Sequence, residues 1–340
     1  MQVPATAPLT SHPVSKLIIQ IPCFNEEATL PETLADLPRE VPGFDTVEWL
    51  VIDDGCTDRT VEVARENGVH HIVSLGHNRG LAAAFTRGLE GALLAGADVI
   101  VNTDADNQYR ADGIADLVAP IVEGEADMVV GERPIETIEA FSWVKKRLQR
   151  LGSRVVRAFS GTDVRDAASG FRAFDRDAAL RLQVFGTYSY TMETLIQAGW
   201  EDLRVTTVEV GVNPPTRPSR LVRSMPRYVF RSATTIVRAY ALYRPFRFFA
   251  LLGMVPFLVS AALFGRWFYL QLFTDDLASR VPSLVGAAVA MIIAVQIWVF
   301  AFVADLLSAN RRMLARIRYS QHKREVDEAA PTDVETAEES

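Results

Sequence analysis

The chain has 340 residues, 49% of them hydrophobic, and a formal net charge of −7. This length is enough for one large domain or two ordinary ones, each with a buried core. The only cysteines, Cys23 and Cys56, exclude a disulfide framework and a cysteine-rich zinc site, and both follow expected strands, which fits a reducing, cytoplasmic setting. Residues 1–15 are rich in Pro, Thr and Ser, lack the apolar core of a signal peptide, and are expected to be disordered.

The negative charge is concentrated at the C-terminus. Residues 325–340 contain seven carboxylates and no Lys or Arg, so the rest of the chain is formally neutral. We expect this segment to be a disordered acidic tail. Its acidic residues are Glu325, Asp327, Glu328, Asp333, Glu335, Glu338 and Glu339.

Short apolar runs alternate with helical patterns through residue 212. Short buried strands that alternate with helices predict βαβ units, and hence an α/β domain with a mainly parallel sheet. The expected strands are 16–23, 49–53, 71–75, 98–103, 128–131 and 205–212. The expected helices end near 37 and 67 or span 81–95, 113–122 and 138–160.

Four of the expected strands end in clusters of polar residues. In parallel sheets, ligands bind beyond the carboxyl ends of the strands. The fourth expected strand ends in Asp104 and Asp106, whose carboxylates are the hard oxygen ligands that Mg²⁺ or Mn²⁺ prefers, often together with substrate phosphates. A plain polar turn is the alternative, because Asp and Asn are common turn residues. The clusters are 22–27, 53–55, 104–108 and 132–133.

Five motifs occur in order over about residues 16–240: IPCFNEE, VIDDGCTD, HNRGLAAAF, NTDADNQY and AASGFRAF. This series resembles glycosyltransferase family 2, and within it the dolichol-phosphate mannosyltransferase-like, or polyprenyl-phosphate glycosyltransferase, group. The resemblance implies a Rossmann-like GT-A fold, a nucleotide-sugar donor, a divalent metal and inversion at the anomeric carbon.

The resemblance also assigns the donor pocket. Asp53 and Asp54 would contact the base and the ribose, since a carboxylate accepts hydrogen bonds from a base N–H and from ribose hydroxyls. A turn followed by a helix cap is the alternative for this pair, and a simple helix start is the alternative for Arg79 and Gly80. The residues placed around the donor nucleotide are Pro22, Asn25, Glu27, Asp53, Asp54, Arg79 and Gly80.

The resemblance places the metal at Asp104, Asp106 and Gln108. A bound Mg²⁺ or Mn²⁺ would neutralise the charge that grows on the departing nucleoside diphosphate. Arg133, at the end of the next expected strand, would help to hold phosphate, because a guanidinium binds phosphate through two hydrogen bonds at once. The alternative is a solvated surface arginine.

The acceptor side resembles the family at residues 166–174, where Arg172 could bind a phosphate. Glu193 stands where other branches of the family place a catalytic acid. A hydroxyl acceptor would need a general base, whereas a lipid phosphate is already an anion, so Glu193 could instead orient groups. Arg217 and Arg220 lie in a Pro-rich basic loop that would meet the phosphates, unless this loop is only a linker.

The helix expected over 138–160 carries a basic face. An ordinary solvated face, a contact with anionic lipid and a site for the acceptor phosphate all fit this pattern. The basic residues are Lys145, Lys146, Arg147, Arg150, Arg154 and Arg157.

The catalytic domain, 16–222, is expected to be followed by membrane segments. Residues 223–244 predict a juxtamembrane amphipathic helix. Residues 245–307 predict two transmembrane helices, at about 248–270 and 281–304, because each run approaches the ~20 apolar residues that span a bilayer. Two buried core helices are the alternative, but little of the chain remains to cover them. Residues 308–340 would form a cytoplasmic basic segment and the acidic tail.

Lys and Arg are concentrated outside the predicted hairpin. Arg238, Arg244 and Arg247 precede it, whereas the turn between the spans carries only Arg280. By the positive-inside rule, the catalytic domain and both termini are cytoplasmic at the cell membrane. Four more arginines follow the hairpin: Arg311, Arg312, Arg316 and Arg318.

These features predict an inverting, metal-dependent transfer of one hexose from a GDP- or UDP-sugar to a polyprenyl phosphate. One alternative is a membrane glycosyltransferase with a hydroxyl acceptor, either a glycolipid or a glycan. Another is a non-catalytic membrane adaptor that binds nucleotide or lipid. No nucleic-acid partner is expected. The sequence leaves open mannose or glucose, GDP or UDP, Mg²⁺ or Mn²⁺, dolichol or undecaprenol, and the oligomeric state.

Overall fold

The computed structural model describes residues 16–134, 152–157, 160–184, 190–214, 230, 233–234, 237–238, 240–242, 244–273 and 280–329. Contacts divide the chain into two compact units. The first comprises Met1–Ile236 together with Tyr319–Ser340, and the second is Val237–Arg318.

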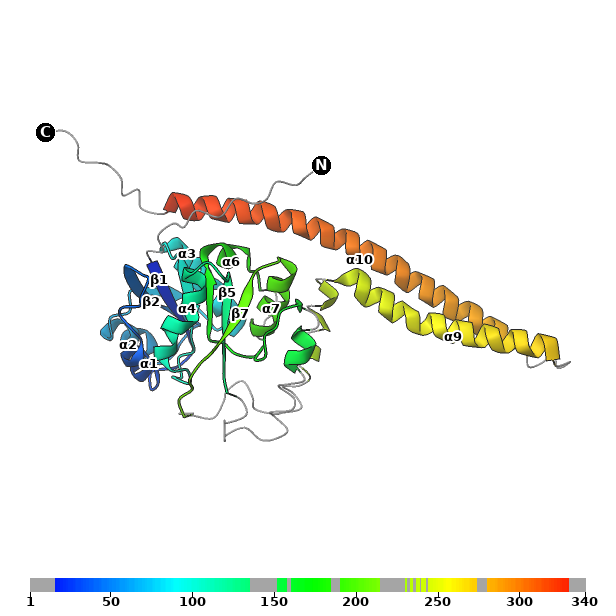
Figure 1. The fold of residues 1–340 in the computed structure, drawn as a ribbon, viewed down its shortest axis with the longest axis horizontal. Helices are drawn as coiled ribbons and strands as arrows, with labels where there is room; N and C mark the ends of the chain where they lie inside the picture. Colours follow the sequence, from blue (N-terminus) through cyan, green and yellow to red (C-terminus); the bar gives the residue numbers. More distant parts are fainter. Residues whose placement is uncertain are drawn as a thin grey trace. The chain divides into compact units, whose positions relative to one another are not determined.

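The first unit is built on a seven-stranded sheet with the order β3-β2-β1-β4-β6-β5-β7. Figure 1 labels β1, β2, β5 and β7 of this sheet. The neighbouring strands run parallel except β6, which is antiparallel to both β4 and β5. The expected mainly parallel sheet is therefore confirmed. The strands are β1 (Lys16–Cys23), β2 (Thr46–Asp53), β3 (His71–Ser74), β4 (Val99–Asn102), β5 (Met128–Glu132), β6 (Arg172–Asp175) and β7 (Val205–Glu209).

Helices cover both faces of this sheet. Alternate residues of each strand point to opposite faces, so strands that are buried along most of their length need cover on both sides. Leu17, Ile19 and Ile21 of β1 share one apolar core with residues of α1, α2 and α4. The opposite face of β1 presents Gln20, which lies against Gly88 of α3. The helices of the first unit are α1 (Leu30–Asp36), α2 (Thr60–Glu66), α3 (Leu81–Leu94), the 3₁₀ turn η1 (Ala111–Gly113), α4 (Ile114–Val122), α6 (Arg176–Arg181) and α7 (Thr191–Trp200).

Most expected elements are present, with ends shifted by a few residues. β2 begins at Thr46, before the expected start. β7 ends at Glu209, before the expected end, and Val212 makes only an isolated bridge to Tyr109. Of the helix expected over 138–160, the structure describes residues 152–157 and 160, which are helical.

The elements β6, α6 and α7 of the first unit were not expected from the sequence, and neither was the short turn η1. β6 has only four residues and opens with Arg172, so it lacks the apolar run that signals a buried strand. In α7, every residue from Thr191 to Ala198 is buried, so no polar face marks it as an amphipathic helix.

The second unit contains two long helices, α9 (Pro245–Phe273) and most of α10 (Arg280–Ala329). Both are long and apolar enough to cross a membrane. Two hydrogen bonds join them: Ser260 Oγ donates to Ala287 O at 2.7 Å, and Trp298 Nε1 donates to Ala250 O at 3.3 Å. Within α9, 11% of the most apolar stretch is buried, which disfavours the alternative of a core helix.

α10 is longer than the expected second span, because it continues past residue 304 to Ala329. Its last residues belong to the first unit, where Asp327 pairs with Arg176 of α6 at 3.1 Å and Val326 is buried. The expectation of disorder from residue 325 onward is therefore wrong for residues 325–329. Most of the expected juxtamembrane helix, 223–244, lies outside the described residues.

Candidate active site

Asp53 closes β2 at the carboxyl edge of the sheet and is 8% exposed. Its Oδ1 accepts a hydrogen bond from the Cys56 backbone N–H at 2.7 Å, and its Oδ2 accepts one from Ser74 Oγ at 2.7 Å. Burial alone would raise the pKa of Asp53, but these hydrogen bonds outweigh burial and lower it. The carboxylate is therefore ionised and held in one orientation.

Asp54 ties the end of β2 to the start of α3. Its Oδ1 accepts from the Arg79 backbone N–H at 2.7 Å, and its Oδ2 accepts from the Gly80 N–H at 3.0 Å. Both carboxylate oxygens are thus occupied by backbone N–H groups at the beginning of a helix, the position where a negative charge is favoured. Asp54, Arg79 and Gly80 do lie together as expected, and the hydrogen bonds match the turn-and-cap alternative.

The remaining donor-side residues lie in two loops that hold each other. Asn25 has a φ of 56°, and its Oδ1 accepts from the Thr57 N–H at 2.8 Å. Glu27 Oε2 accepts from the Arg59 N–H at 3.0 Å. Pro22 lies in β1 directly beside Ile52 of β2. The ends of β1 and β2 therefore form one continuous edge.

The Asp pair follows the buried strand β4, and both side chains are partly exposed. Asp106 Oδ1 accepts from the Gln108 N–H at 3.3 Å, within a turn in which Asn107 has a φ of 52°. The described residues contain no group of three or more His, Cys, Asp and Glu side chains that could hold a metal. Two carboxylates and a Gln amide oxygen are a hard, oxygen-only set that fits Mg²⁺ or Mn²⁺, with phosphate and water as further ligands.

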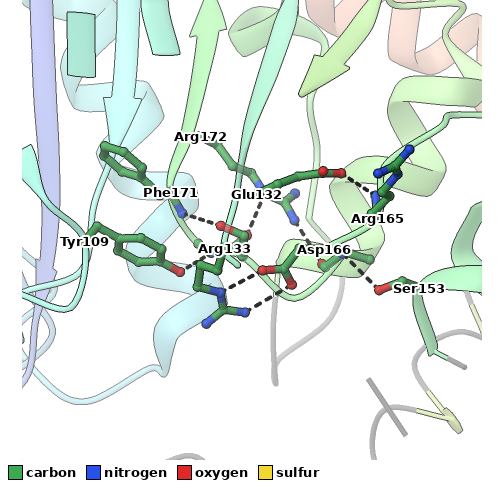
Figure 2. Close-up of polar contacts among 11 residues, drawn as sticks. Tyr109, Glu132, Arg133, Ser153, Arg165, Asp166, Phe171 and Arg172 are labelled. Carbon is green, nitrogen blue, oxygen red and sulfur yellow. Dashed lines mark hydrogen bonds and ion pairs between the residues drawn. The ribbon is translucent and has the colours of Figure 1, made fainter. Parts of the chain in front are cut away.

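Arg133 follows β5 and pairs with Asp166 through two hydrogen bonds (Figure 2). Its side chain is 13% exposed, so it is not the solvated surface arginine that was the alternative. Burial alone would lower the pKa of Arg133, but Tyr109 and Asp166 outweigh burial and raise it. The guanidinium also lies 5.9 Å from the centre of the Tyr109 ring. A permanent positive charge is thus fixed close to the acceptor-side motif.

The side chain of Arg172, the expected phosphate contact on the acceptor side, is completely buried. Its guanidinium donates to Ser169 O at 2.9 Å, to Thr194 Oγ1 at 2.7 Å and to Ala167 O at 3.1 Å. Burial lowers its pKa to about 10. Because these donors are engaged inside the protein, Arg172 organises the acceptor-side segment in this structure, and its expected contact with a phosphate stays a prediction.

Glu193 lies in the first turn of α7 and is 4% exposed. It is close in sequence to Tyr190 and Thr194, both of which contact the acceptor-side segment. The two other expected phosphate contacts, Arg217 and Arg220, lie outside the described residues.

Several polar residues around the site were not singled out from the sequence. Gln20 and Asn102 carried a signal, since each is a polar residue inside an otherwise apolar strand. Tyr109 ends the motif NTDADNQY and Asp166 begins the acceptor-side stretch 166–174, but neither residue was assigned a role, and Tyr190 carried no signal of its own. Each of them makes a hydrogen bond to a residue far away in the sequence. The bonded pairs are Gln20 with Asn102, Asn102 with Tyr190, Arg133 with Asp166, and Gly170 with Tyr109.

Comparisons with known proteins point to one family. The model of the glycosyl transferase family 2 matches residues 18–182. UDP-N-acetylglucosamine–dolichyl-phosphate N-acetylglucosaminyltransferase of Methanococcus voltae is 30% identical over 46% of this chain and 68% of that protein. Undecaprenyl-phosphate mannosyltransferase of Micrococcus luteus is 30% identical over 48% of this chain and 67% of that protein.

The fold has a counterpart among solved structures. Glucosyl-3-phosphoglycerate synthase from Mycobacterium tuberculosis, in complex with Mn²⁺, uridine diphosphate and glucosyl-3-phosphoglycerate, superposes with a TM-score of 0.52 at 23% identity. The match covers 65% of this chain and 80% of that one, which shows a shared fold. Sequence and fold together establish that the chain is a glycosyltransferase and belongs to glycosyltransferase family 2.

Proposed function

We propose that the protein transfers one hexose, with inversion, from a GDP- or UDP-sugar to a polyprenyl phosphate at the cytoplasmic face of the membrane. The observation that carries this proposal is the contact between the acceptor-side motif and the Asp pair. A methyl group placed on Gly170 would lie 3.1 Å from Asp104 Oδ2. The acceptor-side segment thus approaches the residues expected to hold the donor diphosphate.

The relatives support this choice of acceptor. The Methanococcus voltae enzyme is named for a dolichyl-phosphate acceptor, and the Micrococcus luteus enzyme is named for undecaprenyl phosphate. Their sugars differ, since one is named for N-acetylglucosamine and the other for mannose, so these relatives do not select the sugar that this chain transfers.

In the proposed reaction, an oxygen of the acceptor phosphate attacks C1 of the sugar, and the bond between C1 and the diphosphate oxygen breaks with its electrons going to the diphosphate. A Mg²⁺ or Mn²⁺ ion, when bound, supplies Lewis-acid stabilisation of that leaving group. Asp104, Asp106 and Gln108 would hold the ion, and Arg133 would add a fixed positive charge. The acceptor phosphate is already an anion at neutral pH, so Glu193 orients groups and need not remove a proton.

The two long apolar helices fit an acceptor that resides in the bilayer. With both ends of the hairpin on the Arg-rich side, the catalytic domain faces the cytoplasm. Basic residues beside the membrane would each contribute about 1 kcal/mol of attraction to anionic lipid. A soluble donor and a membrane-bound acceptor would thus meet at the inner surface of the bilayer.

The test is transfer by the purified full chain in detergent. GDP-mannose, UDP-glucose and UDP-N-acetylglucosamine, each labelled in the sugar, are offered with a polyprenyl phosphate and either Mg²⁺ or Mn²⁺. We expect one donor to give a lipid-extractable product, and we expect Asp106→Ala to abolish it. Full activity of Asp106→Ala would overturn the metal assignment, and transfer only to a diacylglycerol or glycan hydroxyl would overturn the acceptor.

A further inference from the structure

Three side chains hold the peptide groups on both sides of Gly170. The Gly170 N–H donates to Tyr109 Oη at 3.0 Å. The Gly170 carbonyl accepts from Asn102 Nδ2 at 2.8 Å and from Tyr190 Oη at 3.2 Å. We call Tyr109, Tyr190 and Asn102 the Gly170 clamp. All three are buried, so no water competes for these hydrogen bonds.

The Cα of Gly170 lies against the carboxylate of Asp104. A methyl group at Gly170 would lie 3.1 Å from Asp104 Oδ2, 3.3 Å from Asp104 Oδ1 and 2.9 Å from Tyr190 Oη. Such contacts are tighter than normal packing, so any side chain here would displace the carboxylate or the tyrosine. Only glycine fits here without displacing a neighbour. Asp104 therefore packs against a backbone segment that hydrogen bonds hold in place.

The clamp is itself held rigidly. The Tyr190 ring stacks on Phe85 of α3, with centroids 3.9 Å apart, and the Tyr109 ring stacks on Phe171 at 5.0 Å. Asn102 Oδ1 accepts from Gln20 Nε2 at 2.9 Å across the β1–β4 pair.

We propose that Tyr109 and Tyr190 are positioning residues that set the place of the Asp104 carboxylate through Gly170, and so fix the acceptor-side segment and the metal-binding pair as one unit. This inference rests on the proposed function, in which Asp104 is a metal ligand. Residues that orient a ligand commonly change metal affinity by about 10–100-fold when they are altered. The same rigid unit would keep the acceptor at a reactive distance from the donor, where small displacements are costly.

The test compares single and double variants of the full-length protein. Gly170→Ala places a methyl group too close to the Asp104 carboxylate. Tyr190→Phe removes one hydroxyl and keeps the ring that stacks on Phe85. Gly152→Ala is the matched control, because a methyl group at Gly152 would meet nothing within 4 Å. Electron paramagnetic resonance measures the affinity for Mn²⁺ in the presence of GDP and, separately, of UDP. Circular dichroism verifies that each variant is folded.

We expect Gly170→Ala to weaken Mn²⁺ binding by about 10–100-fold, and Tyr190→Phe to weaken it by an amount near the lower end of that range. The double variant should recover part of the loss, because removal of the hydroxyl lets the methyl group move away from Asp104. Gly152→Ala should bind Mn²⁺ like the wild type. In the transfer assay at saturating Mn²⁺, kcat should fall while the KM for the nucleotide-sugar stays nearly unchanged.

The outcomes separate the two proposals. If the wild type binds Mn²⁺ with nucleotide and both Gly170→Ala and Tyr190→Phe bind it equally well, the clamp is overturned and the proposed function stands. If the wild type transfers sugar but binds no Mn²⁺, the metal assignment fails, and the clamp fails with it. If Gly170→Ala does not fold, Tyr190→Phe still decides, since it removes a single hydroxyl from a retained ring.

Discussion

Arg133 and Asp166 form a paired ion contact, with Nε 2.7 Å from Oδ2 and Nη2 3.1 Å from Oδ1. The contact joins the end of β5 to the segment just before the acceptor-side glycine (Figure 2). Asp166 is 1% exposed and Arg133 is 13% exposed, so water screens the two charges little. The pair therefore fixes a cation beside the site.

Asp166→Ala should destabilise the protein by about 3–5 kcal/mol, because it leaves a buried guanidinium without its partner. Equilibrium unfolding in urea measures this change. The matched control is Glu66→Gln, which breaks the exposed pair with Arg59 and should cost about 0–1 kcal/mol. Equal effects of the two variants would contradict the view that Arg133 and Asp166 act as a buried pair.

Arg172→Lys distinguishes an organising role from a phosphate-binding role. A lysine cannot donate simultaneously to Ser169 O, Thr194 Oγ1 and Ala167 O in the same planar arrangement. We expect a loss of about 2–4 kcal/mol in the free energy of unfolding. The KM for the polyprenyl phosphate, measured per folded molecule, should change less than threefold, roughly the effect of one weak hydrogen bond.

A large increase in the KM of Arg172→Lys for the polyprenyl phosphate, at unchanged stability, would instead show that Arg172 binds phosphate. Arg133→Lys is the useful comparison, because Arg133 is partly exposed and stands closer to solvent than Arg172.

The sequence predicted the parallel part of the sheet because each strand there is a local apolar run between turn residues. The same signal located Asp53, Asp54, Asp104 and Asp106 at strand ends. It could not reveal β6, which has only four residues and no local apolar run, and which lies in the sheet between β4 and β5. Nor could it assign Arg172, since burial of an arginine depends on acceptors from distant segments.

Asp175 should make stability depend on pH. Burial raises the pKa of this carboxyl from 3.8 to about 7 in the folded protein, with Asp127 and Asp177 adding repulsion and Arg204 opposing it. Between about pH 4 and pH 7, the folded state therefore binds more protons than the unfolded state, so stability falls as the pH rises through this window. Asp175 also caps α6, since its Oδ1 accepts from the Ala178 N–H at 2.6 Å.

Asp175→Asn keeps a cap and removes the titration. We expect the variant to lose stability less steeply than the wild type between pH 4 and pH 7, as measured by urea unfolding at several pH values. Parallel curves for the two proteins would show that Asp175 does not titrate in this range.

The end of α10 should be held in the first unit by apolar burial more than by charge. Val326 is 1% exposed, and the Tyr319 hydroxyl bonds to Asp177 while Arg181 lies 5.6 Å from the Tyr319 ring centre. The pair of Asp327 with Arg176 is half exposed on the Asp327 side, so Asp327→Asn should cost about 0–1 kcal/mol. Val326→Asp should instead release residues 319–329, because it buries an unpaired charge.

Hydrogen exchange measures this release directly. We expect the amides of 319–329 to exchange faster in Val326→Asp and to remain protected in Asp327→Asn. The matched control is Leu314→Asp, which places the same charge on α10 at a side chain that is 64% exposed. If Leu314→Asp released residues 319–329 to the same degree, the loss of protection would reflect a weaker helix. The burial of Val326 within the first unit would then not explain how the end of α10 is held.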